Sequence, residues 1–153
     1  MEAGFDDVFD ALGGEGGIEI ETIEDEEEDE GIEATSGIIQ LVNRIITESE
    51  RLGASDIHIE PGKDDAPGGV RIRVDGIFRE LLKVPKEHCA AMIARVKVIS
   101  RLNIAEKRLP QDGKCKLKVR GQQLELRVAT VPTVQGESAV LRILVAGSSR
   151  PWE

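Results

Sequence analysis

Hydrophobic residues recur with two different periods along the chain, and each change of period marks the boundary of an expected element. After Ser36, a suitable N-cap, apolar residues return every three or four positions up to Leu52, which predicts an amphipathic helix over about residues 37–52. From Asp56 to Glu60 polar and apolar residues alternate strictly, which predicts a strand. We therefore expect a helix that leads directly into a half-buried strand.

The same two periods predict five more strands and one more helix. The strands are expected at residues 70–74, 77–82, 114–119, 124–129 and 139–144, and the helix at about residues 85–102, with Arg95, Lys97 and Arg101 off its apolar stripe. Asp75-Gly76 predicts a tight hairpin turn, whereas residues 61–69 and 132–138 have the composition of loops. The predicted order is α-β-β-β-α-β-β-β, an α+β fold with two main helices and a six-stranded, mostly antiparallel sheet.

The net charge of −9 is divided unevenly along the chain. Residues 1–35 hold fifteen of the twenty-nine acidic residues and no Lys or Arg, so residues 36–153, with fourteen acids and twenty bases, carry a net charge of +6. The acidic run at residues 24–30 repels itself and is typical of a solvated linker. We interpret residues 1–35 as an acidic flexible linker, in which residues 5–12 could form a short helix, residues 36–146 as one domain, and residues 147–153 as a tail.

Motif searches exclude several chemistries. The chain contains neither a Walker A loop nor a G-x-G-x-x-G loop, so we expect no nucleotide binding of the usual kind by this chain alone. Cys89 and Cys115 form no C-x-x-C pair and follow no secretory signal, which favours free thiols in a reducing, cytoplasmic setting and no metal site. Cys89 and its neighbour His88 are adjacent on a predicted helix and diverge, so they form no nucleophilic pair.

Asp56, His58 and Glu60 lie on one strand face and could suggest a metal site or a general base. Successive residues on one face of a strand lie about 7 Å apart, too far for one ion without other ligands. We interpret these three residues as structural.

Four arginines are the most informative polar residues. Arg71, Arg73, Arg127 and Arg142 each stand within an apolar alternation, so each projects from a strand face that the core does not use. Strands would hold the guanidinium groups at fixed positions suited to phosphate oxygens, although such arginines can also serve only to solubilise an exposed face. Lys114, Lys116 and Lys118 add to the basic charge, but stacking aromatics and nucleic-acid-binding motifs are missing, so we expect no nucleic-acid partner.

Several longer motifs, in order and with matching spacing, resemble one family over about residues 37–144. They are Leu-Gly-Ala-Ser-Asp-Ile-His-Ile-Glu-Pro at 52–61, Arg-Ile-Arg-Val-Asp-Gly at 71–76 with Arg79-Glu80, Arg-Val-Lys-Val at 95–98, Asn-Ile-Ala-Glu-Lys-Arg-Leu-Pro-Gln-Asp-Gly at 103–113, Leu-Arg-Val-Ala-Thr at 126–130, Pro132-Thr133, Gly136-Glu137, and Val-Leu-Arg-Ile-Leu at 140–144. The chain resembles the domain that precedes the ATPase core of the bacterial ATPases for type II secretion and type IV pilus assembly.

The resemblance implies a PAS-like domain that packs against the ATPase core of its own and a neighbouring subunit in a hexamer. It implies that arginines matching Arg127 and Arg142, and less strongly Arg71 and Arg73, reach the phosphates of ATP, with Mg²⁺ bound in the full-length enzyme and no cofactor in this fragment. It further implies a cytoplasmic protein at the inner membrane, held there by secretion or pilus platform proteins.

The chain departs from the family pattern at three places. Ser138 replaces a usual arginine, residues 64–69 lengthen a loop, and the chain ends before any Walker A loop, so we expect no ATPase activity from it alone. A stand-alone PAS-like module that binds a protein or a small ligand, without ATPase activity, is the alternative interpretation.

Overall fold

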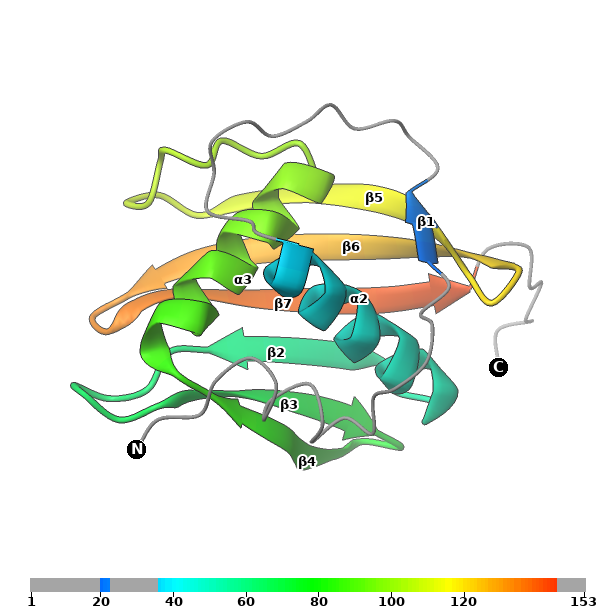
Figure 1. Ribbon diagram of the computed structural model, residues 1–153, viewed down its shortest axis with the longest axis horizontal. Coiled ribbons are helices and arrows are strands. Elements are labelled where there is room, and N and C mark those ends of the chain that lie inside the picture. The colour runs from blue at the N-terminus through cyan, green and yellow to red at the C-terminus, as the bar shows by residue number, and fades with distance from the viewer. Residues whose placement is uncertain (1–19, 23–35, 146–153) are drawn as a thin grey trace.

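The computed structural model describes residues 20–22 and 36–145. Two helices lie across one face of a seven-stranded antiparallel sheet, whose strand order is β1-β5-β6-β7-β2-β3-β4 (Figure 1). The elements are β1 (Ile20–Thr22), α2 (Ser36–Arg51), β2 (Asp56–Glu60), β3 (Gly68–Val74), β4 (Ile77–Val84), α3 (Lys86–Ile99), β5 (Gln111–Val119), β6 (Gln122–Thr133) and β7 (Gly136–Val145).

The predicted α+β class and the order from α2 to β7 are confirmed. The sheet has one strand more than expected, because β1 lies within residues 1–35 and pairs with the edge of β5, Ile20 opposite Val119. The short helix expected at residues 5–12, the acidic run and the tail lie outside the described residues. Neither helix in the described part of the chain is long and apolar enough to cross a membrane.

The loop predicted at residues 132–138 is wrong. β6 continues to Thr133 and β7 begins at Gly136, so only two residues join them. Thr133 stabilises this tight turn, because its hydroxyl donates to the Gly136 carbonyl at 2.6 Å and accepts from the Gln135 amide at 3.1 Å. Gly136 has a φ of 132°, a conformation that side chains disfavour. The Pro in the segment suggested a loop, but strand pairing outweighs that composition.

The core lies between the helices and the sheet. The apolar face of α2 is fully covered, since Leu41, Val42, Ile45 and Ile46 are each at most 2% exposed. They belong, with inward residues of the strands such as Ile57 of β2, to one continuous cluster. Burial of such side chains contributes about 1.5–3 kcal/mol each. Both helices of the described residues lie on this face, so no helix within residues 20–22 and 36–145 covers the other face of the sheet (Figure 1).

A hairpin turn and one close backbone approach fix the β2–β3–β4 half of the sheet. Asp75 and Gly76 both have positive φ, 54° and 82°, as the predicted hairpin turn requires. Gly68 lies against β2, where a Cβ atom would come within 2.3 Å of the Glu60 carbonyl oxygen. A side chain at Gly68 would therefore push the two strands apart.

Lys97 of α3 is buried, contrary to the prediction. It was predicted off the apolar stripe, yet its side chain is 1% exposed. Its Nζ lies 2.6 Å from Glu137 Oε2 and donates to the Glu106 carbonyl oxygen at 2.8 Å. The connection between α3 and β5 folds back over this end of the helix, and Gln111 Nε2 donates to the same Glu106 carbonyl at 3.2 Å. Lys97 thus joins α3, this connection and the β6–β7 hairpin.

Candidate functional site

One row of side chains crosses the middle of the sheet on the face that no described helix covers, and we call it the central row. In an antiparallel sheet, directly opposed residues on neighbouring strands point to the same face. The pairings run without interruption through Lys114, Arg127, Arg142, Asp56, Arg73 and Phe78. The residues that flank this row along the strands, such as Leu126, Leu141 and Ile57, are buried on the helix-covered face, so the row itself faces away from the helices.

Asp56 forms the centre of the row. Its side chain is only 7% exposed, and Arg142 Nε donates to its Oδ1 at 3.3 Å. Arg73 Nη1 lies 3.8 Å from Oδ2, and the Ser55 hydroxyl donates to the same oxygen at 3.0 Å. One buried carboxylate therefore balances guanidinium groups from both neighbouring strands.

Arg127 differs from its neighbours. It is exposed, and within residues 20–22 and 36–145 no carboxylate pairs with it. Together with Lys114 and Arg142 it lines a shallow depression over β5, β6 and β7. Lys114 Nζ is 3.9 Å from Glu125 Oε2 and mostly exposed. Three cations on adjacent strands, spaced by about 5 Å, are an arrangement suited to an anion with several oxygens.

Arg71 and Arg73 are held on the other side of Asp56. Arg71 makes two hydrogen bonds to Glu60, at 3.0 and 3.2 Å. Their guanidinium carbons lie 4.6 and 5.1 Å from the centre of the Phe78 ring, which attracts cations to its face. Both arginines thus have a carboxylate partner among the described residues, whereas none of the described carboxylates pairs with Arg127.

His58 packs edge-on against the Phe78 ring, with centroids 5.1 Å apart. Burial lowers the pKa of His58, the Glu60 carboxylate opposes this change, and Arg71 adds to it. In the described part of the chain, no group of three or more His, Cys, Asp or Glu residues is placed to hold a metal ion.

The structure brings together two of the four arginines singled out from the sequence. Arg127 and Arg142 are direct cross-strand partners, Arg73 follows beyond Asp56, and Arg71 lies in another row, opposite His58. Sequence reasoning did not place Lys114 with them. The turn at Arg120-Gly121, where both residues have positive φ, sets the register of β5 on β6 and thereby pairs Lys114 with Arg127. The short glycine-containing link between the two predicted strands is the sequence feature that could have indicated this pairing.

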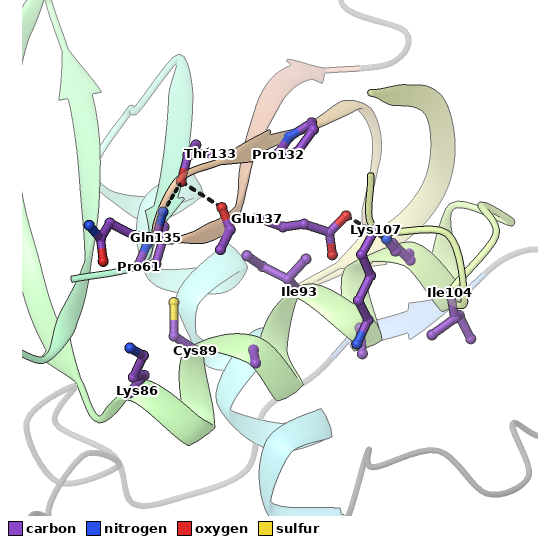
Figure 2. Close-up of a pocket in the computed structure, with 14 residues that line it drawn as sticks. Pro61, Lys86, Cys89, Ile93, Ile104, Lys107, Pro132, Thr133, Gln135 and Glu137 are labelled. Carbon is purple, nitrogen blue, oxygen red and sulfur yellow. Dashed lines mark hydrogen bonds and ion pairs between the residues drawn. The ribbon is translucent and has the colours of Figure 1, made fainter. Parts of the chain in front are cut away.

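A second concavity of about 240 Å³ lies on the helix side, between α3, the α3–β5 connection and the β6–β7 hairpin (Figure 2). Its lining is mostly apolar, including Pro61, Ile93 and Pro132, with the thiol of Cys89 at one side. Burial and, less strongly, Glu60 raise the pKa of Cys89 to about 11, and the thiol donates to the Glu60 carbonyl at 3.4 Å. The thiol is therefore protonated at neutral pH and is a poor nucleophile.

The fold and its surface define a class of protein: an α+β domain that presents arginines from adjacent strands on an uncovered sheet face. A family model described as Type II/IV secretion system protein matches residues 31–150. The chain belongs to this family.

Individual relatives agree with the family match. The type II secretion system protein E of Xanthomonas campestris pv. campestris is 51% identical over 107 residues, which cover 70% of this chain and 18% of that protein. Its counterpart in Pseudomonas aeruginosa is 48% identical, with 70% and 21% covered. The type IV pilus assembly ATPase TfpB of Acinetobacter baylyi is 47% identical, with 69% and 18% covered. The chain thus spans about a fifth of the length of these relatives.

Proposed function

We propose that this chain contains the regulatory domain that precedes the core of a hexameric ATPase for type II secretion or type IV pilus assembly. In this proposal the domain supplies cations to the phosphates of an ATP molecule that an ATPase core binds. The observation that carries it is Arg127, an exposed guanidinium on a rigid strand, next to Arg142 and Lys114 and without a carboxylate partner among the described residues.

The division of charge along the central row supports a specific assignment of roles. Arg127, Arg142 and Lys114 would contact the triphosphate, and they would stabilise negative charge on its terminal phosphate. Arg71 and Arg73 are engaged by Glu60, Asp56 and Phe78, so their part would be to hold that side of the surface in shape. Mg²⁺ would be bound by the ATPase core of the full-length enzyme.

The same proposal covers the partners and the place of action. The uncovered sheet face would dock on the ATPase core of the same or a neighbouring subunit, so that the position of the domain follows the nucleotide state. The assembly would act in the cytoplasm, attached to platform proteins of the inner membrane. A stand-alone binding module is the rival, and the 240 Å³ concavity beside Cys89 is where it would take a ligand.

A domain exchange tests the proposal. Residues 36–145 would replace the corresponding stretch of the type IV pilus assembly ATPase TfpB of Acinetobacter baylyi, to which this chain is 47% identical over the matched residues. We expect the hybrid to hydrolyse ATP within about tenfold of the parent, because the phosphate-facing residues are kept. Deletion of the stretch should abolish hydrolysis, and the 153-residue chain alone should show none.

The parent and the deletion variant are the controls, compared at equal hexamer concentration. Full activity of the deletion variant would contradict a role in ATP hydrolysis. Saturable binding of a small apolar ligand by this chain, combined with an inactive hybrid that still assembles, would favour the rival module instead.

A further inference from the structure

We infer that Asp56 is a positioning residue that holds Arg142 away from the nucleotide until a phosphate competes for it. The inference rests on the proposed function. It adds that the Asp56 carboxylate is bound to Arg142 before ATP arrives, and that a phosphate group must displace this carboxylate from Arg142. It concerns a residue that contacts no nucleotide itself and acts only through Arg142.

The contacts of the Asp56 carboxylate are all with neighbouring polar side chains. The carboxylate is almost fully covered, and it receives Arg142 on one oxygen and both Arg73 and the Ser55 hydroxyl on the other. Arg142, by contrast, is 64% exposed along its side chain. The Arg142 guanidinium is therefore held at Nε by Asp56, while most of the Arg142 side chain remains open to solvent.

Competition follows from these contacts. A carboxylate carries one negative charge, whereas a triphosphate placed against Arg127 brings several within reach of the same guanidinium. Because Arg127 has no such partner among the described residues, it can bind first, and Arg142 can turn from Asp56 to the phosphate afterwards. Arg127 would thus contact any bound anion, whereas Arg142 would contact it only when the anion carries enough charge to compete with Asp56.

Whether Asp56→Asn tightens or weakens anion binding distinguishes this positioning role from a purely structural one. Asparagine keeps the shape and an oxygen for Arg142 but removes the negative charge beside it. Binding of tripolyphosphate by the 153-residue chain at low salt should then tighten about three- to tenfold, from the loss of one repulsive charge at short range. A residue needed only for folding would weaken binding when changed.

Binding is measured by titration calorimetry or NMR on the wild-type chain and on four variants. Arg127→Ala should weaken binding at least about fivefold, since it removes one charge-assisted contact. Asp56→Asn should tighten it, and Arg142→Gln added to Asp56→Asn should remove that gain. Glu60→Gln is the matched control, because its carboxylate pairs with Arg71 outside the central row, and it should change binding less than about twofold.

The two possible failures can be told apart. If Arg127→Ala leaves binding unchanged, the proposed function is wrong. If Arg127→Ala weakens binding while a folded Asp56→Asn chain binds no more tightly than the wild type, or its gain persists without Arg142, the role of Asp56 is overturned. Asp56→Ser, which is smaller and also uncharged, replaces Asp56→Asn should the latter not fold, and the same outcomes decide.

Discussion

Arg127→Ala in the proposed hybrid ATPase should lower kcat about a hundredfold or more without changing the oligomeric state of the hybrid. A positioned cation that meets charge developing on a transferred phosphoryl group accounts for effects of that size. Arg127 is exposed and unpaired among the described residues, so its removal should change the free energy of unfolding by less than about 0.5 kcal/mol. Steady-state ATP hydrolysis and chemical unfolding of the same preparations give both values.

Arg79→Ala is the matched control for this variant. Arg79 is an exposed arginine on the edge strand β4, several strands away from Arg127. Its loss should leave kcat within about twofold. Equal activity of the Arg127 and Arg79 variants would contradict a contact between Arg127 and phosphate. It would indicate that the arginine only makes the exposed face more soluble.

Lys97→Met should lower the free energy of unfolding of the chain by about 3–5 kcal/mol, the usual result of removing one partner from a buried ion pair. Glu137 is 11% exposed and would keep a charge without its cation. The Glu106 carbonyl would also lose one of its two side-chain donors. Urea unfolding followed by circular dichroism measures the change.

A double variant tests whether the loss comes from the unpaired charge. Lys97→Met with Glu137→Gln removes both charges and should recover a substantial part of the lost stability. Lys83→Met breaks the exposed pair with Glu80, whose members are 70% and 49% exposed, and should cost less than about 0.5 kcal/mol. A Lys97→Met chain as stable as the wild type would show that the buried pair contributes nothing.

Periodicity predicted the elements of this fold well because each has one covered face. α2 and β2 were found almost to the residue, since Ser36 begins the helix and the alternation of Asp56–Glu60 continues through the strand. The ends of β6 and β7 were missed because Pro132 and Gly136 favour loops, whereas hydrogen bonding between long strands carried the hairpin further. β1 was missed because its three residues lie in an acidic segment and gain their structure only from the edge of β5.

The sequence predicted which arginines belong to the candidate site, but it did not predict which of them form ion pairs. Alternation placed Arg127 and Arg142 on an exposed face, but it could not tell which guanidinium group already has a partner. That depends on Asp56, which reaches Arg142 across 86 positions of sequence. Lys97 shows the same limit, because its helical position indicated solvent while Glu137 and the α3–β5 connection enclose it.

The most direct test is a structure of the assembled hybrid with a non-hydrolysable ATP analogue, in which the distance from each guanidinium to the terminal phosphate is measured. We predict that Arg127 lies within hydrogen-bond distance of a phosphate oxygen, about 3 Å, and that Arg142 turns from Asp56 toward the same group. Arg127 directed into solvent, more than about 8 Å from any phosphate, would contradict it.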